Sequence, residues 1–176
     1  MDAITIANYY ISKSKQDKPE HELTVLRLVK LVYIAYGHAL TKLLNRCIIN
    51  PRFDKVEAWK LGPVIPSVYH TFKYNGTNPV TELGGYLRTA DDGYGVRMIC
   101  PEVPEDEKDL KKLLDVVWRK YNRYTTAEII DLLHREGTPW EVCYKPNCNC
   151  EIPEEYTRMY YENVVKAVLK HAGHDY

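Results

Sequence analysis

The sequence carries no excess of charge of either sign, because 24 Lys and Arg residues balance 24 Asp and Glu residues. A neutral chain has no whole-molecule field that draws it to DNA or anionic lipid, so nucleic acid is not an expected partner unless a local patch binds it. Long apolar runs are also missing: the longest, residues 31–40, contains Gly37 and His38 and is too short to span a bilayer. The first residues do not read as a signal peptide. We therefore expect a cytoplasmic protein without a membrane partner.

Motifs of common enzyme classes are missing as well. Gly93-Tyr94-Gly95 lacks the lysine and the strand–helix context of a phosphate-binding loop. His21-Glu22 lacks the second histidine of a zinc-protease motif. The three serines, Ser12, Ser14 and Ser67, lie outside any nucleophile-elbow pattern. These absences favour a protein that is not an enzyme and needs no cofactor, although catalytic residues can also converge from distant segments.

The cysteines do not form a disulfide framework, because there are five of them without a paired spacing. We therefore expect free thiols, three of them in a surface loop at Cys143, Cys148 and Cys150. An alternative is a zinc site in which these three thiolates and His134 bind one ion. Structural zinc sites commonly use two CxxC pairs, which this segment lacks, so no metal is predicted.

The hydrophobic pattern predicts a mainly α fold in a single compact domain, residues 1–176, of about six helices. A chain of this length buries roughly 70% of its unfolded surface in one core. The helices are expected around residues 4–11, 23–44, 65–74, 104–121, 125–135 and 153–171. Thr125 and Glu128 have the spacing of a capping box at the start of the fifth.

Two segments depart from the helical pattern. Gly37 lies within the longest apolar helix, where close approach of a neighbouring element would explain the missing side chain. Residues 77–103 are the least helical part, and Asp92-Gly93 between short apolar pieces permits a small β-hairpin near residues 80–100. Residues 55–60 read as a short extended or irregular piece before Leu61-Gly62-Pro63.

Aromatic residues offer two interpretations. Residues 119–124 alternate basic and aromatic side chains, as in surfaces that bind single-stranded nucleic acid. On a helix, however, Tyr121 continues the apolar stripe and the cations form a solvated face, which is the interpretation we prefer. The 15 tyrosines modestly favour a binding module, since tyrosine is enriched at protein interfaces.

Five motifs, in order along the chain, resemble those of one known domain family. Residues 28–38 (LVKLVYIAYGH) resemble the family's LQKLLYFAQGWHL helix, and residues 57–66 (EAWKLGPVIP) resemble its EAWKYGPVVP signature. Residues 117–121 look like its VWxxYG element, and residues 134–140 (HREGTPW) resemble THxxxSPW. A closing IPxxxIxxYF pattern is similar to residues 152–161. Together these motifs resemble the SocA-like, or Panacea, domain of bacterial and phage-associated antitoxins, with a signature region that spans residues 23–161.

The sequence departs from these motifs at three positions. Leu61 replaces an aromatic residue, Asn122 replaces a glycine, and Leu133 replaces a threonine. The candidate partner-binding or signature residues taken from the resemblance are Tyr33, Tyr36, Trp59, Lys60, Gly62, Pro63, Tyr69, His134 and Trp140.

The resemblance implies an antitoxin that neutralises a cognate protein toxin or effector by direct binding. Some members of the family act as adaptors that deliver the toxin to a AAA+ protease, so a protease is a second implied partner. Two other classes stay open: a hydrolase-like enzyme with a cleft around Trp59, Lys60, His134 and Trp140, and a nucleic-acid-binding regulator of phage or mobile-element origin that uses the 119–123 patch.

Overall fold

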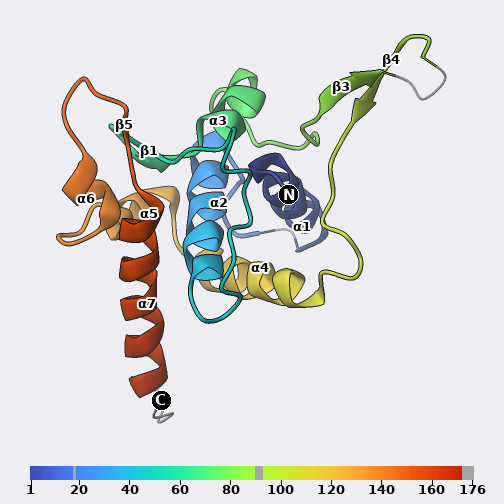
Figure 1. Cartoon of the computed structure of the whole chain (residues 1–176). Helices are drawn as coiled ribbons and strands as arrows, with labels where there is room; N and C mark the ends of the chain where they lie inside the picture. Colours follow the sequence, from blue (N-terminus) through green and yellow to red (C-terminus); the bar gives the residue numbers. More distant parts are fainter. Residues whose placement is uncertain (18, 90–92, 172–176) are drawn as a thin grey trace.

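The computed structural model describes residues 1–17, 19–89 and 93–171. Helices dominate this part, and small β elements accompany them (Figure 1). None of the described helices is both long and apolar enough to cross a membrane. The described residues form seven α-helices where about six were expected; the additional one is the short α6. They are α1 (Ala3–Asp17), α2 (Val25–Leu40), α3 (Pro66–Phe72), α4 (Lys108–Tyr121), α5 (Thr126–Leu133), α6 (Pro139–Cys143) and α7 (Glu154–His171), with a 3-10 turn η1 (Lys73–Asn75) after α3.

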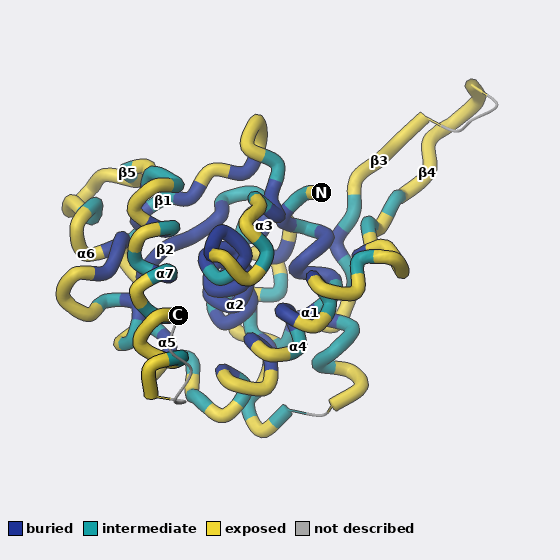
Figure 2. The backbone as a smooth tube through the Cα atoms, turned by 60° about the horizontal axis from the view of Figure 1, so that its bottom comes forward, coloured by how far each residue is buried: buried dark blue, intermediate teal, exposed yellow. Residues whose placement is uncertain are grey.

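Helix α2 is the central element of the fold. All its residues except Leu26 and His38 are buried, and helices α1, α3, α4, α5 and α7 all pack against it (Figure 2). The Thr24 side chain caps its first turn by accepting from the Arg27 amide. The helix ends earlier than predicted, at Leu40, because Thr41 is extended and turns its hydroxyl back onto the His38 carbonyl. Because other helices surround α2, its side chains are apolar on every side of the helix.

A small antiparallel sheet lies over one end of α2 and was not predicted. It contains β2 (Gly62–Val64), β1 (Glu57–Trp59) and β5 (Cys150–Glu151), in that order. Pro63 lies in the edge strand β2, where the missing amide hydrogen costs no bond to a further strand. The short extended or irregular piece expected at residues 55–60 is extended, as strand β1, and β5 pairs Cys150 with Ala58 across a long stretch of sequence.

The expected hairpin near residues 80–100 is present as β3 (Tyr86–Thr89) and β4 (Val96–Ile99). It projects from the helical body as an arm (Figures 1 and 2). The predicted turn residue Asp92 lies outside the described residues. Buried Asn8 of α1 holds the base of the arm: its amide nitrogen donates to the carbonyls of Gly84 and Pro101, and its oxygen accepts from the Gly84 amide.

Gly37 lies under the side chain of Tyr161, as the close approach predicted from its sequence context requires. A methyl group at this position would overlap the tyrosine ring. Tyr161 is buried and also packs edge-on against Tyr33 and His38. The missing side chain thus allows α7 to lie close against α2.

Replacing this glycine is expected to destabilise the fold. In an open helix, Gly37→Ala would gain about 1 kcal/mol from helix propensity. Here the overlap with Tyr161 should dominate and lower the free energy of unfolding by about 1–3 kcal/mol. Urea denaturation followed by circular dichroism measures the change. In a Tyr161→Leu background the same substitution should cost less, because leucine lacks the outer ring atoms; equal costs in both backgrounds would refute the contact.

Candidate functional site

The site begins with a lysine in the middle of the apolar helix α2. Lys30 is fully buried, and its Nζ donates a hydrogen bond to the Pro63 carbonyl of β2 at 2.9 Å. Removing an ammonium group from water disfavours its charged form, and burial lowers the pKa of Lys30 from its usual 10.5 to about 7. Between these two pH values the unfolded chain holds more protons than the folded one, so this group makes the fold more stable as pH rises through that window.

Gly62 lies between Lys30 and a second ionisable side chain, His134. A methyl group on Gly62 would meet Lys30 Nζ at 3.2 Å and His134 Nε2 at 3.3 Å. The residue also has a φ of +102°, a conformation that side-chain-bearing residues rarely adopt. Glycine is therefore required here both by the turn from β1 to β2 and by the approach of the two side chains.

His134 and Trp140 stack face to face. Their ring centroids are 3.6 Å apart and their ring planes are nearly parallel, and Tyr144 also stacks on Trp140 with ring centroids 4.6 Å apart. His134 caps the end of α5, while Trp140 belongs to α6, which begins at the Thr138 cap. Burial, and secondarily the nearby charge of Lys30, lowers the pKa of His134. The lowered pKa favours the neutral imidazole at pH 7.

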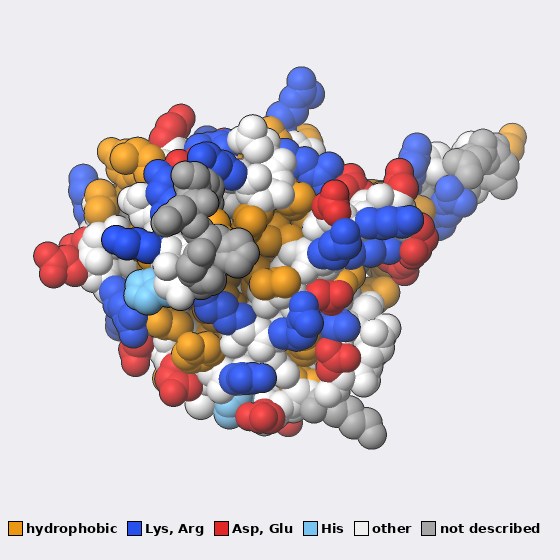
Figure 3. Space-filling model, turned by 90° about the horizontal axis from the view of Figure 1, so that it is seen from below, with side chains coloured by type: hydrophobic (Ala, Val, Ile, Leu, Met, Phe, Trp, Pro, Cys, Tyr) orange, Lys and Arg blue, Asp and Glu red, His pale blue; other side chains and the backbone are white. Residues whose placement is uncertain are grey.

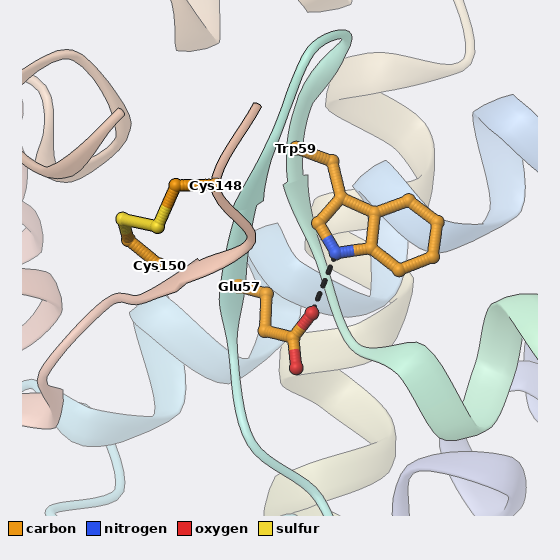
Figure 4. Close-up of a disulfide and its surroundings, with 4 residues drawn as sticks. All are labelled: Glu57, Trp59, Cys148 and Cys150. Atoms are coloured by element: carbon orange, nitrogen blue, oxygen red, sulfur yellow. Dashed lines mark hydrogen bonds between the residues drawn. A yellow bond between two sulfur atoms is a disulfide. The ribbon is translucent and has the colours of Figure 1, made fainter. Parts of the chain in front are cut away.

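Trp140 also ties α6 to the small sheet. Its Nε1 donates to the carbonyl of Trp59 in β1 at 2.7 Å. Trp59 in turn donates its own Nε1 to Glu57 at 2.7 Å (Figure 4) and packs edge-on against Tyr69 of α3 at 4.9 Å. The hydrogen bonds and ring contacts therefore connect α2, the sheet, α3, α5 and α6 at one place. We call these residues the signature cluster: Lys30, Trp59, Gly62, Pro63, Tyr69, His134 and Trp140.

Three of the candidate residues lie outside the signature cluster. Lys60 is exposed in the turn between β1 and β2. Tyr33 and Tyr36 are buried on the part of α2 that packs against α7, where their hydroxyls approach Thr157 and Glu154. Burial raises the pKa of both phenols. Neither tyrosine offers contact area to a partner in this structure.

The cysteine loop differs from the expectation of free thiols. Cys148 and Cys150 form a disulfide beside β1 (Figure 4), whereas Cys47, Cys100 and Cys143 are free. Two of the four ligands of the alternative zinc site, Cys148 and Cys150, are thus joined to each other in this structure. No group of three or more side chains that could hold a metal ion occurs among the described residues. The CxC spacing is compatible with a ligand pair or a disulfide, and the sequence alone cannot distinguish them.

Besides Lys30, two buried charged residues of structural importance, Arg27 and Asp54, were missed in the sequence. Arg27 donates to the carbonyls of Tyr121, Asn122 and Tyr124 after α4. Asp54 accepts from the amides of Ala3 and Asn50 and from the Ser67 hydroxyl. For Lys30 and Arg27 a signal existed: both are cations within an otherwise apolar helix. Asp54 lies in a loop whose sequence gives no such contrast.

Comparisons with known proteins agree with the motifs. The model of the "Antitoxin SocA-like, Panacea domain" family matches residues 28–141, from α2 to α6. The chain belongs to this SocA-like family. It is similar to "Antitoxin SocA" of Caulobacter vibrioides (strain NA1000 / CB15N), with 31% identity over 143 residues, which covers 81% of this chain and 70% of that protein. No solved structure matches the SocA-like chain.

The signature cluster of this SocA-like protein makes a stability prediction at Gly62. Gly62→Ala combines an unfavourable positive φ, about 1–2 kcal/mol, with crowding of Lys30 and His134. We expect a loss of about 2–4 kcal/mol in the free energy of unfolding. Gly137→Ala is the matched control, because Gly137 also has a positive φ of +78° but nothing within 4 Å of the added methyl. Equal losses in the two variants, measured by urea denaturation, would show that the crowding is unimportant.

Proposed function

We propose that this protein is a cytoplasmic antitoxin that neutralises a cognate protein toxin or effector by binding it directly, without catalysis. Membership of the SocA-like family and the similarity to a protein named Antitoxin SocA support this proposal. The whole chain, residues 1–176, would act as a single SocA-like domain. Delivery of the bound toxin to a AAA+ protease is a further step of the same proposal.

The observation that carries the proposal is the inward orientation of the signature cluster. Lys30, Gly62 and Pro63 are buried, and the polar atoms of Lys30 and Trp140 are used in hydrogen bonds to the chain itself. These residues fix the relative positions of α2, α5, α6 and the sheet. A substrate has no access to Lys30, the most reactive amine of the cluster, in this structure. The cluster therefore suits a scaffold better than an active site.

Exposed apolar residues supply contact surface outside the cluster. On the arm, Leu87 pairs directly with Met98 and both are more than 60% exposed. Cross-strand partners share one face of a hairpin, so these side chains and the exposed Val96 form an apolar face away from the core. A protein partner that covers such a face would gain free energy from removing it from water.

The direct test is co-expression with the product of the neighbouring gene. We expect the SocA-like protein to restore growth of cells that express the toxin and to co-purify with it. His134→Ala should weaken this rescue by degrees, because it loosens the stack on Trp140 and the scaffold under the binding surface. Tyr74→Ala is the control and should leave rescue unchanged, because this side chain is 88% exposed and its ring contacts the neighbouring Lys73.

Other outcomes would support the remaining classes of function. Loss of all rescue in a His134→Ala variant that stays folded and still co-purifies with the toxin would indicate catalysis. Tight DNA or RNA binding with a steep salt dependence, lost when Arg119 and Arg123 are replaced, would indicate a nucleic-acid-binding regulator. If the antitoxin left the half-life of the toxin unchanged, delivery to a AAA+ protease would be rejected while neutralisation by binding would stand.

A further inference from the structure

An apolar groove lies on the face of the molecule opposite the small sheet. Helices α4 and α7 both pack on α2 and leave between them a hollow of about 190 Å³. His38 from the last turn of α2 lines it, together with Leu113, Val117 and Tyr121 of α4 and Val165 and Leu169 of α7. Figure 3 shows apolar side chains gathered on this face, with lysine and arginine side chains and also several aspartate and glutamate side chains around them.

The edge of the groove consists of apolar side chains from three separate elements. Leu43, in the loop after α2, is 52% exposed, Val116 of α4 is 51% exposed and Val168 of α7 is 54% exposed. All three line the hollow. Isolated exposed apolar residues are ordinary on a protein surface, whereas several that converge on one hollow are typical of a binding site.

The shape of the groove fits a helix. It follows α4 from Leu113 to Tyr121, about 12 Å along the helix axis, which is roughly two turns. A helix laid in an apolar groove buries side chains at positions i, i+3, i+4 and i+7, and these anchors span a similar length. Helices α4 and α7 form the two walls of the groove and α2 lies beneath them, an arrangement in which a further helix can pack.

The charges around the groove favour an acidic occupant. The ionisable side chains in its lining are His38 and Lys120, and no carboxylate lines it among the described residues. Burial lowers the pKa of His38 to about 4, with a smaller contribution from Lys120, so the histidine is neutral and Lys120 supplies the charge. Lys120 lies over the Tyr121 ring, and no ion pair occupies it in the described part of the chain.

The neighbouring carboxylates do not reverse this charge. Glu162 lies in an adjoining hollow, where Lys42 and Lys166 accompany it. Asp115 of α4 is turned to α1, where it accepts from Tyr9 and pairs with Lys13. Asp109 pairs with Lys112. The surroundings of the groove are therefore cationic.

From these observations we infer that the groove between α4 and α7 is a docking site for an amphipathic helix of the toxin, with an apolar face and acidic residues beside it. This inference rests on the proposed antitoxin function and names the surface that would carry it. The apolar edge would supply most of the affinity, and Lys120 would set the orientation and the rate of association.

The first experiment uses the full chain and a synthetic helical peptide, so that it does not depend on a toxin. The peptide carries Leu and Ile on one face and Glu on both sides; a second peptide carries Lys in place of every Glu. We expect fluorescence anisotropy to show binding of the acidic peptide only. Val116→Glu and Val168→Glu should each weaken it on the order of tenfold or more. Lys120→Glu should weaken it and reduce its salt dependence.

Val142→Glu is the matched control, since Val142 is a helical valine, 59% exposed, on α6 away from the groove lining. It should bind the peptide like the unmodified protein. Failure of the acidic peptide to bind, or equal binding of both peptides, would overturn the inference. A rise in peptide affinity on removal of residues 172–176 would also overturn it, because the occupant would then be the end of the chain itself. A dimer that Val116→Glu dissociates would overturn it as well, because the occupant would be a second copy of the protein.

The same variants then separate the groove from the proposed function. If Val116→Glu and Val168→Glu abolish co-purification with the toxin while Val142→Glu does not, both proposals are supported. If the toxin is still neutralised by both groove variants, the antitoxin function stands and the groove inference is wrong. If the acidic peptide binds in the groove but no neighbouring gene product is neutralised, the groove stands as an acidic-helix site and the antitoxin proposal fails.

Discussion

The hydrogen bond from Lys30 to the Pro63 carbonyl is the constraint on which the arrangement of this protein depends. A lysine in the centre of a helix that is packed on every side must find an acceptor, because an unpaired buried amine costs several kcal/mol. The acceptor comes from β2, so the β1–β2 turn must lie against α2. That placement requires a glycine at position 62, which leaves room for Lys30 and His134. His134 stacks on Trp140, and the Trp140 indole donates a hydrogen bond to the Trp59 carbonyl of β1. A closed chain of contacts thus joins segments that are far apart in sequence.

This chain of contacts explains why the family motifs contain the residues they do. Trp59, Gly62, Pro63, His134 and Trp140 were candidates for partner contact on the basis of resemblance alone. In the structure they lie together, and the indole nitrogens of Trp59 and Trp140 and the Pro63 carbonyl form hydrogen bonds within the chain, whereas His134 Nε2 is buried without a partner among the described residues. A scaffold built in this way leaves the surface of the arm and of the groove between α4 and α7 free to differ between proteins that bind different partners.

Local signals in the sequence predicted the local structure well. The capping box of Thr125 and Glu128 is present, with both reciprocal hydrogen bonds, because such a motif acts within four residues. The close contact at Gly37 was also predictable, since a glycine in an apolar helix needs a reason. Helix α6 was missed because it has five residues and depends on the Thr138 cap and the stack on His134, which no periodicity reveals.

Long-range pairings could not be predicted from the sequence. Strand β5 is two residues long, and helices α4, α5 and α6 separate it in sequence from its partner β1. It is too short to show an alternating hydrophobic pattern, and no tight turn joins it to β1. The signature cluster was recovered in part, since five of its members came from motifs and Tyr69 from the residues after them. Lys30 lay in a quoted motif yet was not selected, because its role depends on a carbonyl 33 residues away.

The protonation of Lys30 tests this account most directly. The full chain, prepared with isotope-labelled lysine, can be titrated by NMR, and the Lys30 resonance is assigned by its loss in Lys30→Met. We predict a midpoint near pH 7 for Lys30, well below the usual 10.5 of a lysine. A Lys30 midpoint at the usual value would show that the amine is solvated and that the signature cluster is not assembled around it.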